Sequence, residues 1–205
     1  MIKAIFFDYD MTLVNSKSIA RKSYNALCKA SEIKPSEKGF DAYVGRRVSE
    51  SIEFFAKTGK SKKELKKTFL KVHEGSIKNL EVYGKNALKH LKKKKIKVII
   101  ISNNSREVIL KVCEIHKLHF DKIIADEDMK KGWKKHQEIH EEIKRLKLKK
   151  SEALYIGDHI NDVKEARKAG IRIASITTGV FNEKELKPYH PDFIIKNLEE
   201  LKRII

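Results

Sequence analysis

Short apolar runs recur along the chain, and stretches with helical spacing separate them. A run that is apolar at nearly every position suits a strand buried on both faces of a parallel sheet. Such runs lie at Ile2–Asp8, Ile96–Ser102, Lys122–Ala125, Ala153–Gly157 and Ile171–Ile176. Helical spacing is found at Arg106–Leu118, Lys134–Leu146 and Asp162–Ala169. The alternation predicts right-handed βαβ units, and therefore an α/β fold with a Rossmann-like parallel sheet covered by helices on both sides.

The C-terminal part adds one more strand and one more helix to this prediction. Phe193–Ile195 is a short apolar run, and Asn197 is a typical helix N-cap. Leu198, Leu201 and Ile205 would share one face of the helix that follows.

One long interval, from about Asn15 to Tyr83, contains no strand pattern. Helical spacing occurs there at Ser18–Ala30, Ser49–Lys57 and Ser61–Leu80, and Ser61 with Glu64 reads as a capping box. The sequence therefore predicts an all-helical domain, residues 15–84, inserted after the first strand. The α/β core would consist of residues 1–14 and 85–205.

Composition narrows the class of protein. Hydrophobic residues make up 40% of the 205 residues and charged residues 36%, which allows a packed core and argues against a disordered chain. No apolar run approaches the ~20 residues that span a bilayer, and the first strand pattern starts at once, leaving no room for a signal peptide. We expect a soluble cytoplasmic protein, with Cys28 and Cys113 reduced and buried.

The net charge of +18 admits two interpretations. A positive field would concentrate anionic substrates or nucleic acid. Alternatively, the charge is a solvated lysine-rich surface, as the runs Lys60–Lys67 and Lys92–Lys95 suggest, since few aromatic residues lie among them to stack on bases. We favour the second interpretation. Abundant Lys, Glu and Ile with a single glutamine also resemble the composition of hyperthermophile proteins.

Polar side chains follow three of the predicted strands directly. In an open α/β sheet, ligands bind beyond the carboxyl ends of the strands. The residues at those ends are Asp8, Asp10, Thr12, Ser102, Asn103, Asp158 and Asp162. Carboxylates crowded in this way repel one another unless a cation neutralises them. A set of oxygen ligands without His or Cys suits Mg²⁺, which would also bind a phosphate oxygen.

This ordered pattern resembles the haloacid dehalogenase superfamily of hydrolases. The matching motifs are Asp8-x-Asp10-x-Thr12 after the first strand, then Ser102, then Gly157-Asp158-x-x-x-Asp162. The resemblance covers nearly the whole chain, including the position of the helical insert. Met11 stands where Gly is common, which leaves both aspartates of the first motif intact.

The resemblance implies a role for each motif residue. Asp8 would be the nucleophile and a metal ligand, and Asp10 the general acid and base, with its backbone carbonyl on the metal. Thr12 would support the loop and belong to the substrate-binding residues. Ser102 and the backbone after it, at Asn103, would hold phosphoryl oxygens. The metal would also be held by Asp158 and, directly or through water, by Asp162.

The family further uses a lysine between the third and fourth strands, which shields the nucleophile and the phosphate. The usual Lys-Pro pair is absent here, and the stretch contains Lys130, Lys131, Lys134 and Lys135. Judged by its distance in sequence from Asp158, Lys134 fits this role best, and Lys131 is the second choice.

The insert resembles the helical cap of the phosphoglycolate phosphatase and β-phosphoglucomutase-like branch. Within it, Tyr43–Arg47 resembles the loop that contacts substrate. Arg46 or Arg47 could grip a substrate carboxylate or a second phosphate. The alternative is that this segment is only a basic surface turn.

Three functions remain open at this point. The leading hypothesis is a Mg²⁺-dependent phosphatase that hydrolyses a small phosphorylated metabolite through a phosphoaspartate on Asp8, as a monomer or homodimer. The second is a phosphomutase or phosphonate hydrolase on the same core, the latter requiring a lysine from the cap. The third is a nucleic-acid-binding protein without turnover, motivated by the charge; intact Asp10 and Asp158 argue against it.

Overall fold

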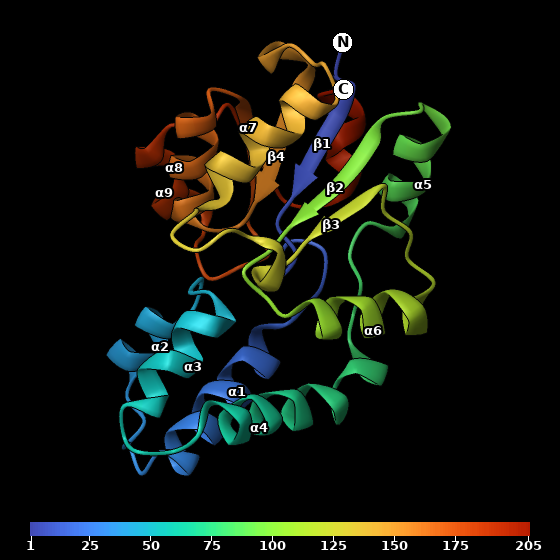
Figure 1. Cartoon of the computed structure of the whole chain (residues 1–205). Coiled ribbons are helices and arrows are strands. Elements are labelled where there is room, and N and C mark those ends of the chain that lie inside the picture. Colours follow the sequence, from blue (N-terminus) through green and yellow to red (C-terminus); the bar gives the residue numbers. More distant parts are fainter.

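The computed structural model describes residues 1–205 and contains one sheet of six parallel strands (Figure 1). The strand order is β3-β2-β1-β4-β5-β6. The strands are β1 (Ala4–Phe7), β2 (Lys97–Ile101), β3 (Lys122–Ile124), β4 (Ala153–Gly157), β5 (Arg172–Ile176) and β6 (Phe193–Ile195). Every neighbouring pair is parallel. The predicted α/β fold is therefore confirmed.

Helices follow the strands in the expected order. The α-helices are α1 (Lys17–Ala30), α2 (Glu37–Tyr43), α3 (Val48–Ala56), α4 (Lys62–Glu74), α5 (Lys85–Lys93), α6 (Arg106–His116), α7 (Lys135–Arg145), α8 (Ile160–Ala169) and α9 (Glu183–Leu186). Short 3₁₀ segments lie at Ile77–Asn79, Asp126–Asp128, Lys150–Glu152, Lys187–Tyr189 and Leu198–Arg203. None of these helices is both long and apolar enough to cross a membrane.

Strand β1 shows why the sheet is covered on both faces. All four of its residues are buried, and successive side chains of a strand point to opposite faces. Ile5 and Phe7 belong to an apolar cluster that includes residues of α5, α6 and the last 3₁₀ segment. Ala4 and Phe6 belong to a second cluster, with residues of α7 and α8. Central strands in such a three-layer arrangement must be apolar on both sides.

Helices α1–α4, which we call the helical layer, lie together beyond the carboxyl ends of the strands (Figure 1). They have an apolar cluster of their own, built from Tyr24, Leu27, Cys28, Phe40, Ile52, Phe55 and Leu65. The chain passes between this layer and the sheet twice. The two passing segments pair with each other, because Asn15 N–H donates to Glu81 O and Tyr83 N–H to Leu13 O.

The structure corrects several predicted elements. Helix α4 ends at Glu74, because Gly75 caps it, and only a 3₁₀ turn follows. The last predicted helix is a 3₁₀ segment, although Asn197 caps it as expected. The pattern missed α2, a short helix that buries only Phe40. The capping box of Ser61 and Glu64 is confirmed.

Candidate active site

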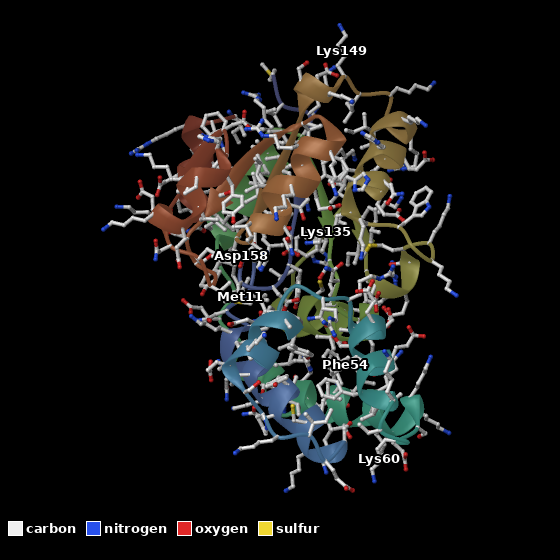
Figure 2. The ribbon with its side chains drawn as sticks, turned by 90° about the vertical axis from the view of Figure 1, so that its left-hand side faces the viewer. Met11, Phe54, Lys60, Lys135, Lys149 and Asp158 are labelled. Atoms are coloured by element: carbon white, nitrogen blue, oxygen red, sulfur yellow. The ribbon has the colours of Figure 1, made fainter.

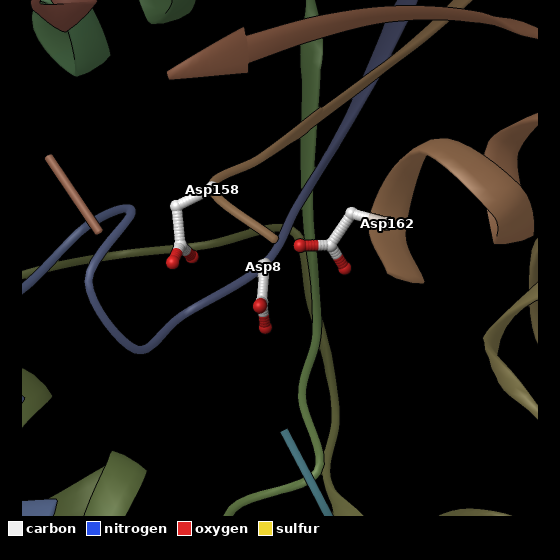
Figure 3. Close-up of side chains that lie close together, drawn as sticks. All are labelled: Asp8, Asp158 and Asp162. Carbon is white, nitrogen blue, oxygen red and sulfur yellow. The ribbon is translucent and has the colours of Figure 1, made fainter. Parts of the chain in front are cut away.

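Three carboxylates from three separate segments meet beyond the carboxyl ends of β1 and β4 (Figure 3). Asp8 follows β1, Asp158 follows β4, and Asp162 lies in the first turn of α8. One oxygen from each of them lies within 4.8 Å of the others. The central position of β1 and β4 in the sheet explains the meeting, since their ends are neighbours at one edge.

The loop after β1 is a tight turn that supports this cluster. Met11 has φ 56°, and its N–H donates to Val14 O. Thr12 is fully buried, and its Oγ1 donates to Asp158 Oδ1 at 2.9 Å. Thr12 therefore orients a carboxylate and does not line the cavity, which corrects its assignment as a substrate-binding residue.

The lysine of this site is Lys135, and the expectation for Lys134 is corrected. Lys135 is 7% exposed, and its Nζ lies 2.9 Å from both Asp8 Oδ1 and Asp162 Oδ1. The side chain of Lys134 pairs instead with Glu50 at 3.2 Å, where both are about half exposed. Lys131 is exposed as well.

A pattern in the sequence could have identified Lys135. It shares a helical face with Ile139 and Ile143, at spacings of four and eight residues, and these two isoleucines pack under the sheet. Lys134 precedes the helix and is turned away from that face. Counting residues from Asp158 ignored this difference.

Asp162 is held rigidly by donors on several sides. Besides Lys135, it accepts hydrogen bonds from Tyr155 Oη at 3.1 Å and from His159 N–H at 3.1 Å. Gly157 makes this approach possible, because a Cβ there would lie 2.4 Å from Asp162 Oδ2. With its lone pairs engaged in this way, Asp162 is better placed to orient Lys135 than to bind a metal directly.

The cluster holds three buried carboxyl groups and one ammonium group. Burial raises the pKa of Asp8 to about 7, against the opposing effect of Lys135. Burial, Asp8 and Asp162 together raise the pKa of Asp158 well above its ordinary value. For Lys135, the attraction of Asp162 and Asp8 outweighs burial and raises the pKa. One ammonium thus faces three buried carboxylates, and this all-oxygen set fits a divalent cation such as Mg²⁺.

Asp10 is positioned by a residue to which the sequence analysis gave no role. Asn104 Nδ2 donates to both carboxylate oxygens of Asp10, at 3.2 and 3.0 Å. The asparagine is itself held, because its N–H donates to Ser102 Oγ at 3.0 Å. Ser102 is 1% exposed and does not line the cavity described next. Asn103 does line it, and its Nδ2 donates to Gly45 O of the helical layer at 2.6 Å.

A cavity of about 340 Å³ lies between the sheet and the helical layer, with the carboxylates on its floor. Figure 2 shows Lys135, Asp158 and Met11 at the level where the two parts meet. Asp8, Asp10 and Asp158 line the cavity from the sheet side. From the helical layer come residues of α1, the end of α2, the loop before α3, α3 and α4, including Tyr43, Gly45, Arg46, Ser51, Phe69 and His73.

The two arginines of the predicted contact loop behave differently. Arg46 lines the cavity, and its guanidinium lies 5.3 Å from the centre of the Phe54 ring, without an ion-pair partner. Arg47 is engaged with Asp126 and with backbone carbonyls of the sheet part. Only Arg46 is free to meet an anionic substrate group. The lysines that line the cavity come from outside residues 15–84.

Comparison with known proteins agrees with the site. The model of the haloacid dehalogenase-like hydrolases matches residues 5–176. "Putative pyrophosphatase PpaX" of Caldanaerobacter subterraneus subsp. tengcongensis is 29% identical, over 100% of this chain and 94% of its own. Phosphoglycolate phosphatase of Vibrio parahaemolyticus is 22% identical, over 100% of this chain and 96% of its own.

A solved structure gives the same result. A Bacteroides fragilis protein assigned to the haloacid dehalogenase-like hydrolases superposes with a TM-score of 0.81 at 26% identity, covering 98% of this chain and 100% of the other. The family model spans most of the chain, from β1 to the end of β5. The chain therefore belongs to the haloacid dehalogenase-like hydrolase family.

Proposed function

We propose that this protein is a Mg²⁺-dependent phosphatase that forms a transient phosphoaspartate on Asp8. The observation that carries the proposal is the contact of Asp8 with Lys135, beside Asp158, on the floor of a cavity that Asp10 also lines. A carboxylate attacks phosphorus only when nearby positive charge offsets its repulsion from the phosphate.

The cation would be held by Asp8, Asp158 and the backbone carbonyl of Asp10. When bound, it would neutralise charge on the phosphoryl oxygens and on Asp8. Asp158 suits this role because Thr12 is its one hydrogen-bond donor among the side chains. Asp162 accepts hydrogen bonds from three donors and would orient Lys135 without binding the cation directly.

The residues of the chain divide the reaction into two steps. In the first, a carboxylate oxygen of Asp8 attacks phosphorus, the bond to the leaving oxygen breaks, and Asp10 gives that oxygen a proton. In the second, Asp10 takes a proton from water, the water oxygen attacks phosphorus, and the bond to Asp8 breaks to release phosphate. Asn104 keeps Asp10 aligned for both transfers.

The cavity supports a small substrate with a second anionic group. A volume of about 340 Å³ suits a small metabolite, and Arg46 is the unpaired guanidinium in its wall. The relatives are named for pyrophosphate and phosphoglycolate, and both compounds carry a second anionic group beside the phosphoryl group. We propose phosphoglycolate as the first substrate to test and pyrophosphate as the second.

The helical layer would act as a cap domain with bounds at residues 15 and 84. Its separate apolar cluster and its two connecting segments support this division. A phosphonate hydrolase is not favoured, because the lysines on the cavity wall do not come from these helices. A cytoplasmic location and a monomeric or dimeric state stay predictions.

The test replaces the nucleophile. With Mg²⁺ present, Asp8→Asn should lower phosphate release from an aryl phosphate at least about a thousandfold. The control is Asp41→Asn, a change at an exposed aspartate of α2, which should leave the rate unchanged. Hydroxylamine added during turnover should convert the acyl phosphate to a hydroxamate on Asp8, detected by mass spectrometry. A wild-type rate in Asp8→Asn would refute the mechanism.

A further inference from the structure

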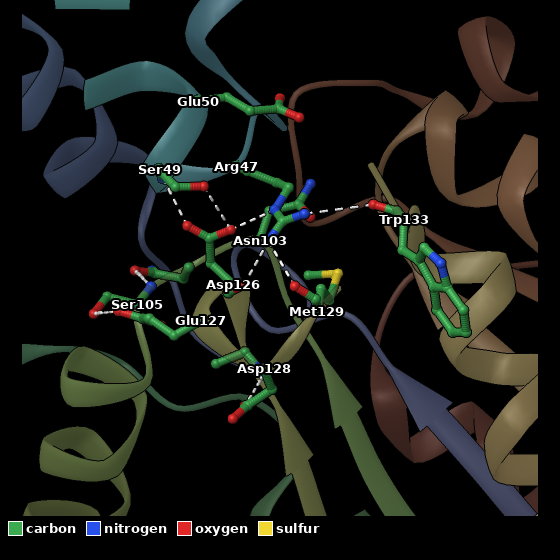
Figure 4. A network of polar contacts seen from close by, with 12 residues as sticks. Arg47, Ser49, Glu50, Asn103, Ser105, Asp126, Glu127, Asp128, Met129 and Trp133 are labelled. Atoms are coloured by element: carbon green, nitrogen blue, oxygen red, sulfur yellow. Dashed lines mark hydrogen bonds and ion pairs between the residues drawn. The ribbon is translucent and has the colours of Figure 1, made fainter. Parts of the chain in front are cut away.

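Arg47 reaches out of the helical layer and binds the segment between β3 and α7 (Figure 4). Its Nε donates to the Asp126 carboxylate. Its Nη2 donates to Asp126 O at 2.6 Å and to Met129 O at 3.3 Å. Its Nη1 lies 3.5 Å from the carbonyl oxygens of Lys130 and Trp133. One guanidinium thus contacts four carbonyls spread over eight residues of the segment.

Asp126 is fastened to the helical layer by a second residue. Ser49 donates its N–H to Asp126 Oδ2 at 2.6 Å and its Oγ to Asp126 Oδ1 at 3.0 Å. Asp126 is 2% exposed, so its charge is balanced by these contacts and not by water. We call Arg47, Ser49 and Asp126 the clamp. Breaking one partner of such a buried pair leaves an uncompensated charge, which is strongly unfavourable.

The clamped segment leads directly into the catalytic lysine. Trp133, whose carbonyl Arg47 contacts, is two residues before Lys135, the first residue of α7. Around Gly132 the segment is open: φ is +78°, and no heavy atom lies within 4 Å of the position that a Cβ would take. Before this glycine the segment is also held by the sheet part, because Arg106 pairs with Asp128 and Met129 is buried in an apolar cluster. The clamp therefore connects the backbone that leads to Lys135 with the helical layer.

We propose that Arg47 is a positioning residue that couples docking of the helical layer to placement of Lys135. When the layer is docked, the clamp fixes the segment Asp126–Trp133 and Lys135 contacts Asp8. When the layer moves away, the guanidinium leaves with it, and the segment loses the bonds of the clamp. The site is then complete only while the cavity is covered. The part of this inference that concerns turnover rests on the proposed function. The part that concerns the position of the Lys135 side chain does not.

The experiment measures how accessible the amine of Lys135 is to a reagent in solution. The full-length protein is treated briefly with an amine-acetylating reagent, and the rates of modification at Lys135 and Lys144 are compared by mass spectrometry. Lys144 lies on the same helix, and its side chain is 77% exposed, so it is the internal reference. Arg47→Lys keeps the charge but cannot reach four carbonyls. The matched control is Arg21→Lys, which breaks an exposed pair with Glu37 inside the helical layer.

Arg47→Lys should raise acetylation of Lys135 relative to Lys144 by about tenfold or more, because the segment before Lys135 loses its bonds to the guanidinium. Arg21→Lys changes only an exposed pair and should not alter the ratio. The kcat of Arg47→Lys should fall about a hundredfold, as for a misplaced catalytic group. Ser49→Ala, which removes one bond to Asp126, should give an acetylation rate of Lys135 between those of the wild type and Arg47→Lys. It allows the test to be made even if Arg47→Lys folds poorly.

Unchanged acetylation of Lys135 in folded Arg47→Lys and Ser49→Ala would overturn the coupling. Acetylation needs no turnover. If the wild-type protein had no phosphatase activity, the proposed function would fail, but the acetylation rates would still test the coupling.

Discussion

The neighbouring lysines at the start of α7 offer the sharpest test of how the site is built. Lys135→Met and Lys134→Met each remove one positive charge and leave the net charge of the two variants equal. Lys135 contacts two buried carboxylates, whereas Lys134 forms one exposed pair with Glu50. Any difference between the variants therefore comes from location alone.

The expected magnitudes follow from burial. Removing one partner of a buried ion pair costs about 3–5 kcal/mol. Asp162 keeps its bonds from Tyr155 and His159, so we expect about 3 kcal/mol, at the lower end of that range. An exposed pair is worth about 0–1 kcal/mol. For turnover, a unit charge about 4 Å from another contributes about 4 kcal/mol at the effective dielectric of a protein site, or about a thousandfold in kcat.

Two measurements check these values. Urea unfolding gives the free energy of each variant, and phosphate release with saturating Mg²⁺ gives kcat. We expect Lys135→Met to lose both stability and nearly all activity, and Lys134→Met to resemble the wild type. If Lys134→Met were the more damaging change in either assay, the assignment of Lys135 would be wrong.

Two further predictions concern other parts of the structure. Gly179→Ala would place a Cβ 1.9 Å from Asp158 Oδ2, so Asp158 must move. The Mg²⁺ concentration for half-maximal activity should then rise about tenfold or more. Gly75→Ala, with no neighbour nearer than 3.9 Å, should leave that concentration unchanged, and equal Mg²⁺ titration curves for the two variants would contradict the metal role of Asp158. Burial raises the pKa of Glu142, but bonds from Arg145 and Lys122 outweigh it and hold the pKa below 4.5. The stability that this carboxylate provides is therefore present above pH 4.5 and lost as the pH falls through its lowered pKa. Glu142→Gln should have a lower free energy of unfolding than the wild type at pH 7, and the difference should shrink in acid. A difference in urea unfolding that does not change with pH would refute this.

The strand pattern was enough to predict the sheet and the edge at which the carboxylates meet. A strand that is apolar on both faces fits only the middle of a covered parallel sheet, and the ends of adjacent parallel strands must lie together. The meeting of Asp8, Asp158 and Asp162 therefore follows from sequence order and strand positions. The all-helical character of the insert followed from its spacing in the same way, although α2 and the end of α4 did not.

The partner that a side chain meets on a distant segment depends on the tertiary structure. Lys134 and Lys135 have the same chemistry. The spacing of Lys135 with Ile139 and Ile143 places it on the apolar face of α7, and the packing of that face against the sheet brings it to Asp162. Arg46 and Arg47 both border the cavity, but the docking of the helical layer pairs Arg47 with the buried Asp126 and leaves Arg46 unpaired.

What the sequence determined by itself was the type of each element and the order of the acidic motifs, because both depend on local spacing. Only the tertiary structure decided which partner each of two adjacent side chains meets. A rotation of about 100° per residue along a helix separates neighbours in sequence, and long-range packing selects the face that is buried.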